Sequence, residues 1–130
     1  MKNPEAERRR HPRIPKGLPL KIKGQDFDFV TETINISRSG AYCQVSQYIA
    51  PMTKLGIIIL LSIKRGNKTV TKKLQCQGAV VRTEEDPNGG YRIAVFFSEI
   101  SGPDSQKISQ YVESYLNSEV TEKPHLTFYA

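Results

Sequence analysis

Apolar and polar residues alternate with a period of two through most of this chain, and no other feature constrains its fold as strongly. Leu18, Leu20 and Ile22, for example, are separated by Pro19 and Lys21. The same alternation covers residues 18–23, 27–34, 69–82 and 91–97, with a short strand-like segment at 41–45. Successive side chains of a strand point to opposite faces, so this period predicts half-buried β-strands.

The segments between these runs have the composition of turns. Residues 35–40, 65–68 and 84–90 are rich in Gly, Asn, Ser and Asp, and residues 47–54, which include Pro51, form a connection. A continuous apolar run, Leu55–Ile63, predicts one central buried strand. Five or six short strands at this spacing predict an all-β fold, a closed or nearly closed antiparallel barrel.

After Gly102 the period changes to that of a helix. The apolar positions are then Ile108, Tyr111, Val112, Tyr115 and Leu116, which form one stripe. We expect this helix to cover an opening of the barrel, with its tyrosines in the core. The predicted organisation is a flexible basic arm (residues 1–16), a barrel with its closing helix (17–117) and a tail (118–130).

The positive charge of the chain is concentrated at its start. Residues 1–23 carry eight basic and two acidic side chains, which accounts for the whole net charge of +6, and the remainder is neutral in sum. A basic arm of this kind is either a solvated tail or an anion-binding segment, because the arginine fork matches phosphate geometry. Composition alone leaves both readings open.

Neither catalysis nor membrane insertion is indicated. His11 and His125 fall in the predicted arm and tail, and Cys43 and Cys76 sit at strand positions typical of small buried side chains. No GxxxxGK[ST], HExxH or GxSxG motif occurs. The longest uninterrupted apolar run, Leu55–Leu61 before Ser62, has seven residues, against the roughly 20 that span a bilayer, and no apolar segment follows Met1. We expect a non-enzymatic cytoplasmic domain without metal or cofactor.

Two short segments carry the candidate chemistry. The only RxxxR spacing in the chain joins Arg9 and Arg13, which an extended segment would hold about 13 Å apart on one side. The second segment runs from Asn35 to Gly40 and fits the pattern [D/N]xSxxG. Its polar side chains and its glycine could present an amide, a hydroxyl and backbone groups to a ligand. Each motif is weak alone, but the pair beside the first strands of a barrel is specific.

With these motifs in place, residues 8–116 resemble the PilZ domain family. The resemblance includes the strands at 78–82 and 91–97 and the closing helix. It implies a six-stranded barrel that binds the bacterial second messenger cyclic di-GMP and has no catalytic activity. It also implies that Arg9 and Arg13 grip phosphate and guanine, while Asn35, Ser37 and Gly40 read the other side of the ligand.

Arg10 and Arg38 are plausible additional cations for this ligand, although both could equally be solvated. Cyclic di-GMP is expected to order the arm across the barrel and so create a surface for a downstream partner protein. One alternative is a ligand-independent adaptor of the same fold. Another is a basic barrel that binds single-stranded nucleic acid, which the neutral sum of the charges after residue 23 makes less attractive.

Overall fold

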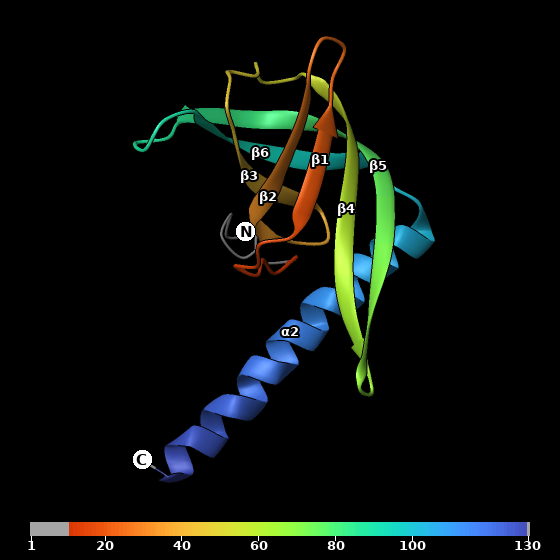
Figure 1. The fold of residues 1–130 in the computed structure, drawn as a ribbon, viewed down its shortest axis with the longest axis vertical. Coiled ribbons are helices and arrows are strands. Elements are labelled where there is room, and N and C mark those ends of the chain that lie inside the picture. Colours follow the sequence, from red (N-terminus) through yellow and green to blue (C-terminus); the bar gives the residue numbers. More distant parts are fainter. Residues whose placement is uncertain (1–10, 130) are drawn as a thin grey trace, which may run out of the picture.

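The computed structural model describes the backbone of residues 11–129 and the side chains of residues 11–117. In this part of the chain six antiparallel strands form a closed barrel in the order β1-β2-β3-β6-β5-β4 (Figure 1). The strands are β1 (Pro19–Lys23), β2 (Asp28–Ile36), β3 (Gly40–Val45), β4 (Lys54–Arg65), β5 (Lys68–Glu85) and β6 (Tyr91–Glu99). One helix, α2 (Gly102–Tyr129), follows β6. The all-β fold expected from the alternation, with its terminal helix, is confirmed.

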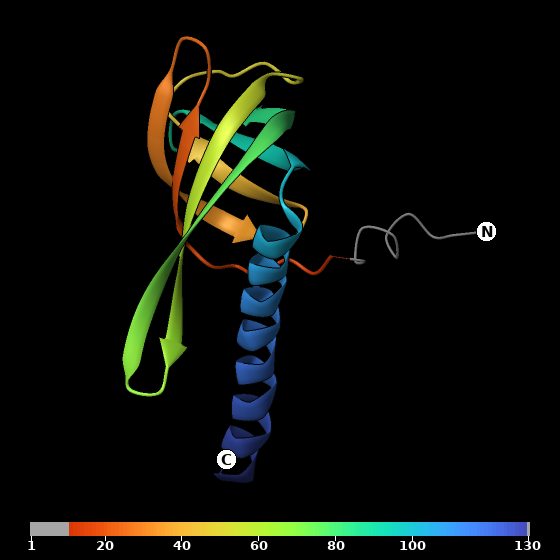
Figure 2. The same ribbon diagram turned by 90° about the vertical axis from the view of Figure 1, so that its right-hand side faces the viewer.

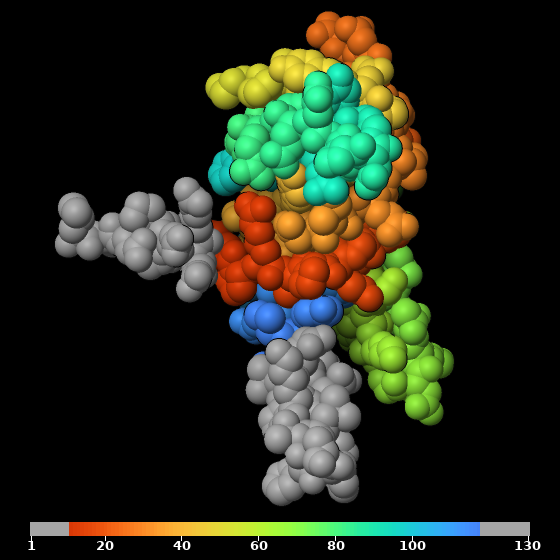
Figure 3. All heavy atoms as spheres, turned by 90° about the vertical axis from the view of Figure 1, so that its left-hand side faces the viewer, coloured from red at the N-terminus to blue at the C-terminus, as the bar shows by residue number. Residues whose placement is uncertain are grey.

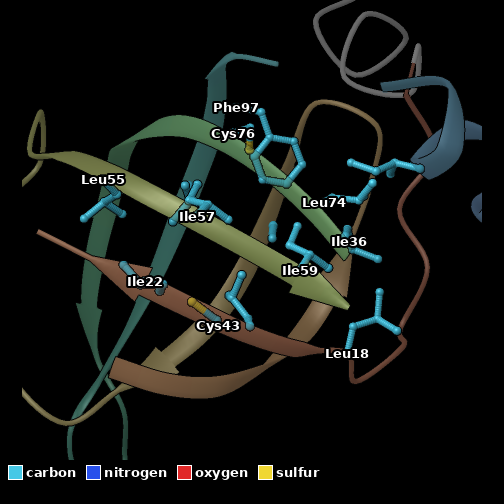
Figure 4. Close-up of a cluster of buried hydrophobic side chains, with 14 of the residues drawn as sticks. Leu18, Ile22, Ile36, Cys43, Leu55, Ile57, Ile59, Leu74, Cys76 and Phe97 are labelled. Atoms are coloured by element: carbon cyan, nitrogen blue, oxygen red, sulfur yellow. The ribbon is translucent and has the colours of Figure 1, made fainter. Parts of the chain in front are cut away.

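The alternating apolar side chains point into the barrel. Figure 4 shows this core, to which all the strands contribute; its labelled residues are Leu18, Ile22, Ile36, Cys43, Leu55, Ile57, Ile59, Leu74, Cys76 and Phe97. Each Leu or Ile removed from water in this way stabilises the fold by about 1.5–3 kcal/mol before the cost in conformational entropy. The alternation therefore accounts for both the strands and the interior.

Strand β4 differs in one respect from the expected buried strand. Leu55, Ile57, Ile59 and Leu61 are buried, but the residues between them are half-exposed. A barrel wall has only one inner face, so a continuous apolar run is buried on alternate residues. Beyond Ile59, which pairs with Leu20 of β1, strand β4 continues with β5 alone as a long hairpin.

The turn of this β4–β5 hairpin is the one predicted at residues 65–68. Arg65 pairs with Lys68 across a two-residue turn, and Gly66 has a φ of +64°. Glycine at the first central position with positive φ is the requirement of a type II′ turn, whose twist matches that of the flanking strands.

The second predicted hairpin loop is shorter than expected, because β5 continues to Glu85. Asp86 opens the loop: its carboxylate accepts hydrogen bonds from the Asn88 backbone N–H at 2.9 Å and from Arg92 Nε at 2.9 Å. Both interactions favour the ionised carboxylate and, with the Asn88 N–H contributing most, lower the pKa of Asp86 below its ordinary value.

Part of the segment expected to be a flexible arm is fixed against the barrel. Ile14 is fully buried and forms a bridge to Ile36, with backbone N–O distances of 2.9 and 3.0 Å. Thr33 Oγ1 accepts a hydrogen bond from the Leu18 N–H and donates one to the Lys16 carbonyl. Residues 11–16 of the predicted arm are therefore seated on the barrel by an apolar side chain, a backbone bridge and the bonds of Thr33.

Helix α2 begins against the barrel and extends beyond it (Figure 2). Ile108 and Val112 are buried in the core cluster together with Ile14. The helix continues to Tyr129, whereas the sequence led us to expect a tail from residue 118. No glycine or proline occurs between Asp104 and Pro124, so nothing in the sequence ends the helix earlier. No helix in residues 11–129 is long and apolar enough to cross a bilayer.

Candidate functional site

The first contact of the candidate site joins the two motifs. Arg13 Nη1 lies 3.5 Å from Asn35 Oδ1, at the outer limit of a hydrogen bond, although the residues are 22 positions apart in the sequence. The antiparallel bridge between Ile14 and Ile36 brings the two segments together, and the Arg13 side chain reaches Asn35 diagonally across it. The guanidinium of Arg13 is exposed, so it is accessible to an anion.

The other two arginines of the cationic motif, Arg9 and Arg10, lie outside the described residues. The structure therefore places Arg13 and the polar loop, and the N-terminal half of the RxxxR motif stays a prediction.

Ser37 occupies a different position from the one expected of a residue that presents its hydroxyl to a ligand. It is fully buried, and its Oγ accepts a hydrogen bond from the Ser39 backbone N–H at 3.2 Å. The Ser37 N–H in turn donates to the Gly40 carbonyl at 2.9 Å. Ser37 thus stabilises the turn from within, and Ser39 is a participant that sequence reasoning missed. A serine two residues after another serine in a turn is the signal that could have revealed it.

Arg38 is the exposed cation of this turn. Its Nε donates a hydrogen bond to Ser105 Oγ at 3.1 Å, which links the loop to the first turn of α2. Ser105 could not be identified from the sequence, because it lies 67 positions after Arg38 and belongs to neither motif. Arg13 and Arg38 are the described arginines that the two motifs supply to this region.

Gly40 is needed for a close approach of two strands. A Cβ atom at this position would lie 2.3 Å from the Val95 carbonyl oxygen, far inside van der Waals contact. Gly40 pairs with Phe96 at the start of β3, and its φ is not positive. The glycine of the motif therefore permits the turn to join the barrel wall, rather than supplying an unusual backbone conformation.

The two cysteines of the barrel are buried thiols. Burial raises the pKa of the Cys43 thiol to about 12 and that of Cys76 to about 11, so both are protonated at neutral pH. Among the described residues, no group of three His, Cys, Asp or Glu side chains could hold a metal ion. Exposed guanidinium and amide groups are suited to binding an anion with hydrogen-bonding edges.

Comparison with known proteins gives a family and a fold. The PilZ domain model matches residues 7–114. Among solved structures, the Bacillus subtilis inhibitor of motility, MotI/DgrA, has a TM-score of 0.72 and 24% identity, covering 84% of this chain and 52% of its own. The PilZ domain with c-di-GMP of YcgR from Escherichia coli has a TM-score of 0.57 and 15% identity, covering 91% and 98%. No curated protein matches.

The solved structures support the same fold, and the present chain spans about half the length of MotI/DgrA. The family model covers both motif segments, the six strands and the first half of α2. On this match the chain belongs to the PilZ domain family.

Proposed function

We propose that this chain is a receptor for cyclic di-GMP, acting in the bacterial cytoplasm without catalysing a reaction. The observation that carries the proposal is the position of Arg13 beside Asn35, which joins the two motifs on one exposed surface. Two further points support it. The chain belongs to the PilZ family, and the YcgR domain of similar fold is described with c-di-GMP.

The chemistry of the ligand matches what the segments offer. Cyclic di-GMP carries two phosphates and two purines, so it requires cations, hydrogen-bonding groups and stacking planes together. Sub-micromolar binding needs about 8 kcal/mol or more. A hydrogen bond to a charged group contributes about 1.5–3 kcal/mol and a stacked base about 1–3 kcal/mol. Arg13 alone is therefore insufficient, and the proposal assigns additional contacts to Arg9, Arg10, Asn35 and Arg38.

Within this proposal the residues of the turn have two different roles. Asn35 contacts the ligand, whereas Ser37 and Gly40 hold the turn in the conformation that exposes Asn35 and Arg38. Ligand binding gathers Arg9 and Arg10 beside Arg13 and draws Arg38 away from Ser105. The rearranged surface then contacts a downstream partner protein. Because residues 11–16 are already seated on the barrel, the change is confined to residues before His11 and to the Arg38 side chain.

Isothermal titration of the full chain with cyclic di-GMP tests the proposal. We expect saturable binding by the wild type and at least tenfold weaker binding by Arg9→Ala and by Arg13→Ala. Arg65→Ala, at the tip of the β4–β5 hairpin, removes an equal charge outside the site and should bind as the wild type does. Undiminished affinity in both arm variants would contradict the assignment. A wild type that takes up no cyclic di-GMP would favour the ligand-independent adaptor.

A further inference from the structure

The β4–β5 hairpin concentrates positive charge that the sequence total conceals. The cations of its outer part, residues 60–76, are Lys64, Arg65, Lys68, Lys72 and Lys73. No acidic residue occurs anywhere between Glu32 and Glu84, so nothing along this stretch of sequence neutralises them. The neutral sum of residues 24–130 therefore arises from a basic hairpin and acidic residues elsewhere.

The hairpin also has open backbone edges. Strand β6 pairs with β5 only from Gln77 to Glu85, which leaves Lys68–Cys76 bonded on the β4 side alone. Within residues 11–129 no strand pairs with this outer edge of β5. Figure 2 shows the hairpin diverging from α2, with the lower part of β5 on the side away from the helix. The edge presents nine residues of extended backbone, enough for a complete added strand.

The side chains along the edge limit what could pair with it. Lys68 and Lys73 are exposed and Lys72 is half-buried, with exposed Thr69 and Thr71 between them. Lysines on an open edge disfavour pairing with a second copy of the same basic edge, because like charges would be brought together. They permit pairing with a strand of opposite charge.

We propose that the outer edge of β5, residues Lys68–Cys76, binds an extended acidic segment of a partner protein by β-strand addition. Main-chain hydrogen bonds supply the binding free energy common to any strand, and the three lysines select carboxylate side chains. The edge has no exposed aromatic side chain, which is unlike surfaces that stack nucleic-acid bases or enter the membrane interface. This surface is distinct from the Arg13–Asn35 region and does not depend on cyclic di-GMP.

The experiment uses the full chain and a fluorescein-labelled decapeptide of alternating Glu and Val, followed by fluorescence anisotropy at 50 mM salt. We expect saturable binding that the triple variant Lys68→Gln/Lys72→Gln/Lys73→Gln weakens at least tenfold. The matched control, Lys64→Gln/Arg65→Gln, removes cations from the β4 edge of the same hairpin and should change the dissociation constant less than threefold. Circular dichroism verifies that both variants fold.

Amide hydrogen exchange separates strand addition from charge attraction alone. Added strands protect the amides that face outward on the edge, so slower exchange is expected within residues 68–76 when the peptide is bound. Four outcomes would overturn the proposal: no peptide binding by the wild type, equal losses in the two variants, unchanged exchange in residues 68–76, or binding to vesicles containing phosphatidylglycerol or to duplex DNA in place of the peptide.

Discussion

Arg38 Nε donates a hydrogen bond to Ser105 Oγ across 3.1 Å, so the turn between β2 and β3 is joined directly to the first turn of α2. The guanidinium is charged, but both side chains lie at the surface, where solvent screening holds a contact of this kind to about 0–1 kcal/mol. The contact is therefore weak enough to exchange for a ligand phosphate. Loss of this contact on ligand binding would also change the surface at the start of α2.

Removing the serine hydroxyl should favour the ligand. In Ser105→Ala the guanidinium of Arg38 no longer has to leave a partner, so we expect cyclic di-GMP to bind up to about fivefold more tightly. Arg38→Ala should weaken binding, and Ser114→Ala, an exposed position further along α2, should have no effect. Titration calorimetry on the three variants checks this. Equal affinity in Ser105→Ala and Arg38→Ala would show that the contact is unrelated to ligand binding.

The buried anchor of residues 11–16 should affect both stability and binding. Ile14→Ala removes a fully buried side chain and is expected to lower the free energy of unfolding by about 2–5 kcal/mol. Ile34→Ala, on the exposed side of β2, should change it by less than about 0.5 kcal/mol. Urea denaturation measures both changes.

The Ile14 variant also tests the position of Arg13. Because the bridge to Ile36 places Arg13 beside Asn35, the milder Ile14→Val, expected to cost about 0.5–1.5 kcal/mol, should leave ligand affinity intact while Ile14→Ala reduces it. A stable, folded Ile14→Ala protein with wild-type affinity would show that the anchor has no part in the site.

Gly40 should not tolerate a methyl group. The added Cβ of Gly40→Ala would meet the Val95 carbonyl at 2.3 Å, so β3 and β6 must separate. The expected loss of stability is about 1–3 kcal/mol, as for other overpacked interiors. Gly102→Ala is the matched control, since nothing lies within 4 Å of its Cβ position at the start of α2. Thermal denaturation of both variants distinguishes them; similar melting temperatures would contradict the close approach.

Asp86 should make stability depend on acid pH. Its pKa is lowered in the folded state, so the unfolded chain takes up a proton more readily as the pH falls. The stabilisation by Asp86 is complete well above its ordinary value of 3.8 and is lost as the pH falls through the lower folded value. Asp86→Asn should therefore melt at a lower temperature than the wild type near pH 7, and the difference should shrink below about pH 4.

Melting curves from pH 7 to pH 3 provide the measurement. Asp26→Asn makes the same chemical change at an exposed position before β2 and serves as the control. A difference between the wild type and Asp86→Asn that stays constant over this range would mean that the Asn88 and Arg92 interactions do not depend on the charge of Asp86.

The fold could be predicted because its information is local. Alternation within each strand shows which side chains face inward, as at Leu74 and Cys76. The Gly66–Asn67 pair marks the turn of the β4–β5 hairpin. The anchoring of Ile14 could not be predicted in this way. It is a single apolar residue between Arg13 and Pro15, without a period, and its partner is 22 positions away.

The two motif segments of the candidate site could be recognised in the sequence, but their geometry could not. A register shift between Thr33 and Asn35 moves the inward-facing position to Ile36, and Ser37 is then buried in the turn after β2. No pattern in the sequence marks that irregularity. The positive charge of the β4–β5 hairpin likewise does not show in the net charge of residues 24–130. The pairing of β4 with β5 places Lys64 and Lys73 on one two-stranded ribbon.

The burial of Ile14 with Ile108 and Val112 has a mechanical consequence. Figure 3 shows the start of the described chain lying directly against the first half of α2 at one end of the barrel. The two segments together close this end of the barrel, and the strands surround them. A force applied to residues 11–16 is therefore transmitted to α2 by direct contact, and the strands of the barrel need not deform.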